Sequence, residues 1–195
     1  MQAPNSILVE IRQDVAIITF NRPQARNALS IDVLDGLDEI ISELTDRSDI
    51  NRLIFTGREN VFLSGADIRQ LRSLDPEAAS IFGERGQRLF HRIAAARQKT
   101  VAAINGFCMG GGLDFALACD IRVAAPNAEF AHPGARLGII TGWGGTQRLP
   151  RLIGRPRAIE FFITARRLSA REAFNIGLVD AVDASPLQYS LQISL

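Results

Sequence analysis

The stretch from Val101 to Ala118 constrains the fold more than any other part of the chain. It contains an apolar run at 101–104, a turn at Asn105-Gly106, a glycine triplet at 110–112 and a second apolar run at 113–118. This order predicts a buried strand, a turn, a glycine-rich loop and a helix that begins among the glycines. Strands and helices that alternate in this way indicate the α/β class.

The same alternation extends along the rest of the chain. Residues 7–11 and 15–20 predict a hairpin around Gln13-Asp14, and Ser30 is typical of an N-cap before an acidic amphipathic helix. Strands are expected at 53–56, 120–124 and 129–132, and helices at 156–165, at 170–176 and from the glycine loop 142–146 toward Ile153. A long helix is expected over 76–97, although its two internal glycines, Gly83 and Gly86, each disfavour a helix by about 1 kcal/mol.

No long linker interrupts this pattern, and we expect one domain over residues 1–195. Residues 1–180 would form the core, and residues 181–195 would be a short tail, in which 189–195 show no convincing helical pattern. The chain is 47% hydrophobic, which is enough for a sizeable core.

Composition argues against several classes of protein. The net charge is +1, no apolar run approaches the ~20 residues of a membrane span, and the first residues lack the pattern of a signal peptide. We therefore expect a cytoplasmic protein without a membrane partner. Cys108 and Cys119 are expected to be buried thiols, because their spacing to each other and to the two histidines is not that of a metal site.

The glycine triplet is the first candidate for a binding site. Glycines at a helix start let a ligand approach the backbone, and the first turn offers unpaired N–H groups that suit an oxyanion or a phosphate. The alternative is a tight turn or close packing. The phosphate loop, the dinucleotide fingerprint and the nucleophile elbow are all absent, and Ser64 has no pattern that would activate it.

Several segments together resemble the crotonase superfamily, that is, the enoyl-CoA hydratase/isomerase family. They keep the order of that family over roughly residues 7–182. The matching segments are Asn21-Arg22-Pro23 with Asn27-Ala28-Leu29, Ser64 to Ile68, Ile104 to Gly112, Ala118 to Arg122, Gly144 to Leu149 and Leu168 to Val179.

The resemblance implies a spiral of repeated β-β-α units that lacks most of the usual C-terminal helical region. It also implies that the oxygen of an acyl-CoA thioester lies between the backbone N–H groups of Ala66 and Gly111, as in an oxyanion hole. No cofactor is expected apart from the coenzyme A of the substrate. A homo-oligomer, a trimer or a hexamer, is expected by resemblance.

The coenzyme A part of the substrate would be held by two neighbouring segments. One consists of Asp67 and Ile68, and the other of Ala25, Arg26 and Asn27. Arg69 is a further candidate for a phosphate or adenine contact, and a solvated surface arginine is the alternative.

The acid/base residues depart from the pattern of the family's hydratases, which use two glutamates. Asp114 takes the first position and keeps a carboxylate, which would act as base or proton shuttle or would only stabilise the first turn of a helix. Gly134 takes the second, and no carboxylate occurs between Glu129 and Glu160. His132 lies two residues earlier, and strand alternation would direct both residues to one side.

Three outcomes remain open for the reaction. Asp114 works alone with ordered water, His132 contributes, or the chemistry is that of an isomerase, decarboxylase, hydrolase or ring-closing synthase. An acyl-CoA-binding protein without chemistry is the alternative from a different class.

Seven arginines and a single acidic residue, Glu160, lie between Arg148 and Arg171. They would face phosphate or nucleic acid, or else form a solvated or subunit-contact surface. Nucleic acid is not expected as a partner, since the predicted helix at 31–46 bears no lysine or arginine.

Overall fold

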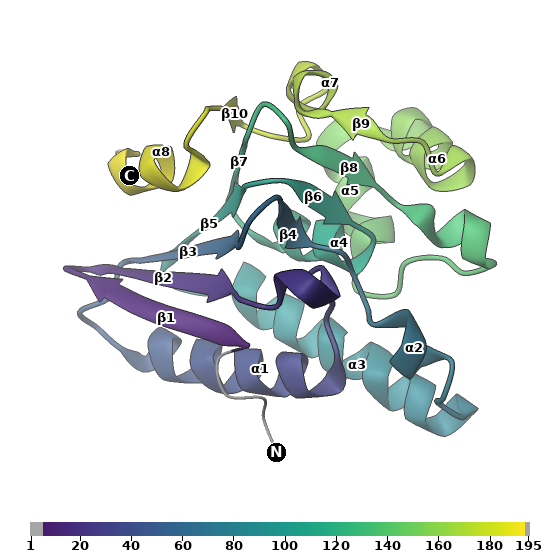
Figure 1. Cartoon of the computed structure of the whole chain (residues 1–195), viewed down its shortest axis with the longest axis horizontal. Coiled ribbons are helices and arrows are strands. Elements are labelled where there is room, and N and C mark those ends of the chain that lie inside the picture. Colours follow the sequence, from purple (N-terminus) through teal and green to yellow (C-terminus); the bar gives the residue numbers. More distant parts are fainter. Residues whose placement is uncertain (1–5, 194–195) are drawn as a thin grey trace.

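The computed structural model describes residues 6–193, and its strands form two sheets (Figure 1). The larger sheet has the order β1-β2-β3-β5-β7-β10 and is parallel except for the β1–β2 hairpin. Its strands are β1 (Ile7–Arg12), β2 (Val15–Phe20), β3 (Arg52–Gly57), β5 (Lys99–Ile104), β7 (Ile121–Ala124) and β10 (Ala181–Val182). The smaller sheet consists of β4 (Val61–Leu63), β6 (Phe107–Met109), β8 (Glu129–Ala131) and β9 (Leu168–Ser169), in that order.

The chain repeats one unit three times. In each unit the first strand joins the larger sheet, the second joins the smaller sheet, and helix follows. The units are β3-β4 with α2 (Ile68–Leu71) and α3 (Pro76–Ala94), β5-β6 with α4 (Gly111–Ala118), and β7-β8 with α5 (Gly145–Ile153). This arrangement confirms the expected α/β spiral of β-β-α units.

The main core lies between the larger sheet and the helices below it in Figure 1. Phe115 of α4 stands at its centre and contacts Phe20, Phe55 and Phe90 edge-on, at centroid distances of 5.5, 4.9 and 5.4 Å. Helix α1 (Ile31–Asp46) adds its apolar stripe, and Ser30 caps it by accepting a hydrogen bond from the N–H of Val33, as predicted. This packing fixes α4, and with it the glycine triplet at the start of α4.

The C-terminal segment differs from the prediction. Helix α8 (Pro186–Gln192) covers the other face of the larger sheet, where no helix was expected over 189–192. The prediction failed because distant residues stabilise this helix. Its leucines pack on the sheet, and the buried guanidinium of Arg52 donates to the carbonyls of Ser190, Leu191 and Ile193. Residues 194–195 lie outside the described part of the chain.

The strand predicted at 129–132 was wrong at its end. Strand β8 stops at Ala131, because Pro133 has no N–H for the ladder and begins the 3-10 turn η2 (Pro133–Leu137). Gly134 is therefore a residue of η2, and strand alternation does not relate it to His132. Strands β4, β6, β9 and β10 and helix α2 were not predicted either. The remaining elements are η1 (Pro23–Ala25), α6 (Arg155–Thr164) and α7 (Ala170–Asn175), and the last two match their predicted ranges closely.

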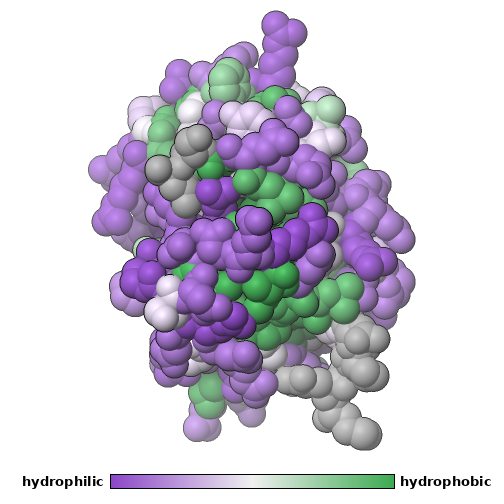
Figure 2. Space-filling model, turned by 90° about the vertical axis from the view of Figure 1, so that its left-hand side faces the viewer, coloured by the Kyte–Doolittle hydropathy of each residue, from purple (hydrophilic) through white to green (hydrophobic). Residues whose placement is uncertain are grey.

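The face of the molecule that carries the tip of the β1–β2 hairpin is largely hydrophilic, with apolar residues that emerge between hydrophilic ones (Figure 2). Val9 and Ile11 of β1 are 43% and 42% exposed. Within residues 6–193, no helix combines the length and the apolar composition needed to span a bilayer.

Candidate active site

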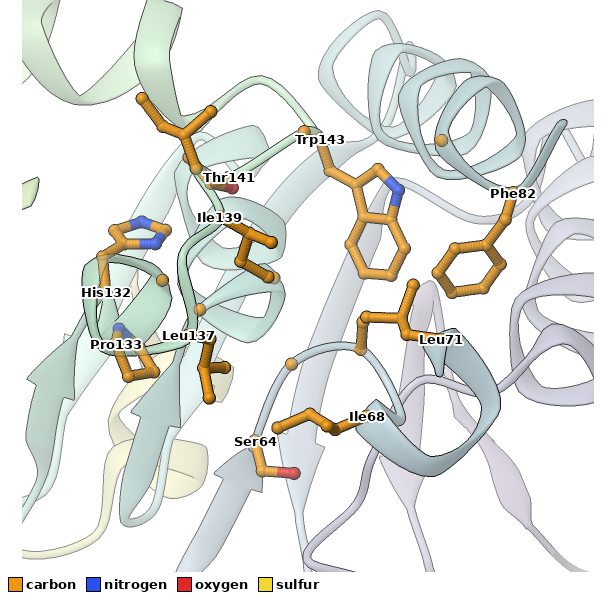
Figure 3. A pocket seen from close by; sticks show the side chains of 18 of the residues that line it. Ser64, Ile68, Leu71, Phe82, His132, Pro133, Leu137, Ile139, Thr141 and Trp143 are labelled. Atoms are coloured by element: carbon orange, nitrogen blue, oxygen red, sulfur yellow. The ribbon is translucent and has the colours of Figure 1, made fainter. Parts of the chain in front are cut away.

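A cavity of about 420 Å³ lies where the repeated units meet. Five parts of the chain line it: the loop after β4, helix α2, the start of α4, the segment from His132 to Trp143, and one face of α3. Figure 3 shows Trp143, Phe82 and Leu71 on one side and His132, Pro133 and Leu137 on the other. The walls are mainly apolar, with a few polar groups, as in a site for a small organic ligand.

The N–H of Ala66 is directed away from the strand to which its residue is paired. Ala66 forms a parallel bridge with Leu29. In this bridge the Leu29 N–H donates to the Gly65 carbonyl at 2.8 Å, and the Asp67 N–H donates to the Leu29 carbonyl at 3.1 Å. Since neighbouring amides of an extended chain point to opposite sides, the Ala66 N–H faces the start of α4.

Gly111 supplies a second amide at the same place. It is the first residue of α4, so its N–H has no partner within the helix. The preceding Gly110 has φ 54° and ψ −123°, a conformation that favours glycine, and its N–H is held by the Ala131 carbonyl at 2.8 Å. A Cβ built on Gly111 would lie 3.5 Å from the Ala66 nitrogen. Both residues line the cavity, so the structure brings together the two predicted amides.

Trp143 forms the floor of the cavity and was not predicted. Its indole lies between Gly86 of α3 and Gly111, and a Cβ at either glycine would collide with the ring. Its ring centroid is 5.2 Å from that of Phe82 and 5.5 Å from that of Phe90. Gly86, one of the two glycines that weakened the helix prediction, is therefore needed for contact with this ring. A glycine inside a predicted helix, together with a tryptophan elsewhere in the chain, was the sequence pattern that could have indicated this contact.

Arg148 anchors the same tryptophan. Its guanidinium donates to the carbonyls of Trp143 and Phe90, at 3.1 and 3.3 Å. Burial lowers the pKa of Arg148 from its ordinary value. This arginine, the first of the arginine-rich stretch, therefore acts inside the fold.

Asp114 lies behind the wall of the cavity. Its residue has no exposed surface, and it does not line the cavity. The hydroxyl of Thr141 donates to its Oδ2, and Oδ1 lies against Gly145, where a Cβ would collide with it. The predicted role of Asp114 as base or proton shuttle therefore remains a prediction, and any such role would act through the groups in front of it.

His132 stands between Asp114 and the cavity. It lines the cavity and is only 3% exposed, with its ring packed against Phe161 and Phe162 at centroid distances of 6.0 and 5.0 Å. Its Nε2 is 3.2 Å from Asp114 Oδ1. Neither atom has an aligned hydrogen-bond partner within residues 6–193. The contact therefore meets the distance of an ion pair but not the geometry of a hydrogen bond.

Gly134 cannot carry a side chain without a change in the loop. A Cβ there would lie 2.5 Å from the carbonyl oxygen of Ile139, whose N–H donates to the Gly134 carbonyl at 3.0 Å. The turn is thus closed by this hydrogen bond and leaves no space for a side chain at Gly134. Ile139 and Ile140 follow at the mouth of the cavity, where they are 52% and 68% exposed.

The loop predicted to hold coenzyme A adjoins the Ala66 loop. The Ser64 N–H donates to the carbonyl of Arg26 at 3.2 Å. Asn27 is buried, and its side-chain amide donates to the carbonyls of Val61 and Phe62. Its side chain therefore ties the loop to β4, and its backbone N–H donates to the Arg22 carbonyl at 2.9 Å. Ala25 ends η1, and the side chain of Arg26 is exposed.

The second predicted segment begins helix α2. Asp67 caps this helix, because its carboxylate accepts hydrogen bonds from the N–H groups of Arg69 and Gln70 at 3.0 and 3.4 Å. Ile68 is 44% exposed and lines the cavity. The side chain of Arg69 is exposed, so it is accessible to a phosphate from solvent.

The remaining candidates lie away from the cavity. Cys108 and Cys119 are buried and unpaired, as predicted, and burial raises the pKa of Cys119 to about 12. Residues 6–193 contain no group of three potential metal ligands. In the arginine-rich stretch, Arg166 pairs with Glu160 and Glu172, and Arg167 pairs with Glu129.

Comparison with known proteins agrees with this architecture. A family described as enoyl-CoA hydratase/isomerase matches residues 10–190. The chain is 41% identical over 179 residues to the short-chain-enoyl-CoA hydratase of Clostridium acetobutylicum, covering 91% of this chain and 69% of that protein. It is 42% identical over 181 residues to the crotonyl-CoA hydratase of Syntrophomonas wolfei, covering 92% and 70%.

Solved structures give the same result. Pseudomonas aeruginosa DspI superposes with a TM-score of 0.92 at 37% identity, over 96% of this chain and 72% of that chain. The enoyl-CoA hydratase of Bacillus anthracis superposes with a TM-score of 0.91 at 35% identity, over 96% and 73%.

Proposed function

The chain belongs to the enoyl-CoA hydratase/isomerase family and has an enoyl-CoA hydratase-like function; from this premise we propose how its residues carry out the reaction. The thioester carbonyl of an enoyl-CoA is polarised by the N–H groups of Ala66 and Gly111. The single observation that carries this proposal is the convergence of these two amides on the wall of one cavity. Fixed donors in a site that excludes water stabilise a developing enolate oxygen by about 3–4 kcal/mol each.

The apolar walls suit the acyl group of the substrate. Leu71, Phe82 and Trp143 would contact the acyl chain, while the thioester oxygen lies at the amide pair. The coenzyme A part would leave the cavity along the loops at 25–27 and 67–69. Coenzyme A enters with the substrate, and we propose no separate cofactor.

Hydration at this site adds the oxygen of water to Cβ and a proton to Cα. The enolate that forms between the two events carries its charge on the oxygen at the amide pair. A shift of the double bond passes through the same kind of enolate. The proton would be handled on the side of the cavity that carries His132, with Asp114 behind it.

Two further features are proposed from family membership alone. The enzyme would assemble as a homo-oligomer, a trimer or a hexamer, and it would work in the cytoplasm. Sedimentation velocity tests the assembly, and a monomer at micromolar concentration would contradict it.

A catalytically silent acyl-CoA-binding protein is the second candidate. The closed turn at Gly134 favours it, because a glutamate cannot stand there without displacing Ile139. Turnover of a panel of 2-enoyl-CoA and 3-enoyl-CoA thioesters separates the two candidates, when it is followed by liquid chromatography with mass spectrometry, because chromatography resolves the double-bond isomers that have equal mass. We expect hydration or isomerisation of at least one thioester. Calorimetric binding of the whole panel without any product would establish the silent protein and end the catalytic proposal.

A further inference from the structure

His132 and Asp114 occupy different positions relative to the cavity. Both are buried, at 3% and 0% exposure, yet His132 lines the cavity and Asp114 does not. The hydroxyl of Thr141 and the backbone of Gly145 cover the carboxylate. Figure 3 shows the imidazole at the edge of the cavity, next to Pro133. A substrate in the cavity would therefore meet the imidazole and would be screened from the carboxylate.

The surroundings of the imidazole fix its orientation. Phe161 and Phe162 of α6 pack against the ring, and Oδ1 of Asp114 in α4 lies 3.2 Å from Nε2. Within residues 6–193, Asp114 is the only charged side chain with a recorded contact to this ring. A buried carboxylate is costly unless a donor lies near it, and Nε2 lies within ion-pair distance of Asp114 Oδ1 without hydrogen-bond alignment. This proximity favours a proton on Nε2.

The second ring nitrogen, Nδ1, is then left with its lone pair. Of the two nitrogens, only Nε2 is completely buried without a hydrogen-bond partner. No hydrogen bond of Nδ1 is recorded within the described part of the chain, and the ring lines the cavity. Nδ1 is therefore the basic atom open to a ligand. In a histidine, the partner of one nitrogen sets the tautomer and so the task of the other.

We propose that His132 is the catalytic residue that moves the proton at the substrate, and that Asp114 is a positioning residue that acts through it. This inference rests on the proposed function and assigns the proton transfer of that reaction to Nδ1 of His132. The turn at Gly134 has no room for a second carboxylate, so one group serves both proton transfers.

The proton balance closes with this single group. In hydration, Nδ1 takes a proton from water while the water oxygen bonds to Cβ and the thioester becomes an enolate. The same proton then passes from Nδ1 to Cα, and the carbonyl re-forms. In a shift of the double bond from Cβ–Cγ to Cα–Cβ, Nδ1 takes a proton from Cα and returns it to Cγ.

Exchange of the α-protons of butyryl-CoA with D₂O, followed by proton NMR, tests the assignment. Exchange needs only the amide pair and one base, whichever reaction follows. We expect the wild type to exchange and His132→Gln to lose about 10²–10⁴-fold in exchange rate while binding of butyryl-CoA, measured by calorimetry, changes little. Asp114→Asn should lose less than His132→Gln, because the imidazole remains in place, and should shift the pH dependence of the rate.

The matched control is His91→Gln. His91 is an exposed residue of α3 and does not line the cavity, so this variant should exchange like the wild type. A folded His132→Gln variant that exchanges at the wild-type rate would overturn the assignment, as would a loss in Asp114→Asn at least as large as that in His132→Gln. A wild type that binds butyryl-CoA without exchange would instead refute the proposed function, and this inference with it.

A measurement on the wild type avoids any question of whether the variants fold. The ¹⁵N chemical shifts of the His132 imidazole report its tautomer directly. We expect Nε2 to be protonated and Nδ1 to carry the lone pair, and we expect Nδ1 to respond more than Nε2 when butyryl-CoA binds. The opposite tautomer would overturn the proposal.

Discussion

The two walls of the cavity are built in different ways. On one wall, the main-chain wall, the functional groups are the amides of Ala66 and Gly111, which are positioned by a strand bridge and by a helix start. On the other wall, the side-chain wall, they are side chains around the short turn η2, which is followed by a loop with two exposed isoleucines. A main-chain donor depends on the shape of the backbone, so many sequences can supply it. A side-chain acid or base depends on one residue, and it can change while the fold stays the same.

The largest expected effect comes from removal of one amide. Ala66→Pro deletes the N–H, while the bridge hydrogen bonds use the Gly65 carbonyl and the Asp67 N–H and should persist. We expect kcat to fall about 10²–10³-fold, the loss that follows removal of one oxyanion donor. Steady-state kinetics on an enoyl-CoA that the wild type converts measures this fall.

Ala66→Ser is the control, because it keeps the N–H and should retain most of the activity. The melting temperature shows whether the proline variant is folded. A folded Ala66→Pro variant with wild-type kcat would mean that the N–H of Ala66 on the main-chain wall does not contribute to catalysis.

The second expected effect concerns stability at the side-chain wall. Gly134→Ala places a Cβ 2.5 Å from the Ile139 carbonyl, and we expect the free energy of unfolding to fall by roughly 1–3 kcal/mol. Gly142→Ala, eight residues further along the same wall, meets nothing within 4 Å and should change it by less than about 0.5 kcal/mol. Urea denaturation of the two variants compares them. Equal losses would contradict the closed turn.

A smaller effect is expected on α3, which borders both walls. A Cβ on Gly83 meets nothing within 4 Å, so Gly83→Ala should raise the free energy of unfolding by up to about 1 kcal/mol. Gly86→Ala should lower the free energy of unfolding, because the Cβ collides with Trp143.

Since Gly83 lines the cavity, Gly83→Leu should also shorten the acyl chain that is accepted. An unchanged chain-length preference in Gly83→Leu would place the acyl group elsewhere.

The smallest effect tests whether the main-chain wall opens in solution. Cys108 precedes the glycine triplet and is buried, and burial raises its pKa well above the ordinary value. The thiolate is the reactive form, so a raised pKa leaves the neutral, unreactive thiol at pH 8. We expect a disulfide reagent to label neither cysteine in the native protein and both in urea. Rapid labelling of Cys108 without denaturant would mean that the wall opens.

Most of the main-chain wall was predictable from sequence. The glycine triplet acts within a few residues, so a local pattern marks it. The resemblance to the family then assigned the two amides to Ala66 and Gly111, and the structure places these residues together. Their catalytic role itself stays a prediction.

The side-chain wall was less predictable, because distant contacts decide it. The burial of Asp114 depends on Thr141 and Gly145, which follow about thirty residues later in the sequence. The direction of His132 depends on Pro133 next to it and on the packing of α6. Helix α8 escaped prediction for the same reason, since Arg52 stabilises its end from β3.

Trp143 is the only tryptophan of the chain, and it forms the cavity floor against Gly111. Fluorescence excited selectively from tryptophan is therefore an optical signal from one place, the site itself. Its emission wavelength and intensity will change when a ligand displaces water from the indole. A titration in a fluorimeter can thus report occupancy of the site without a label.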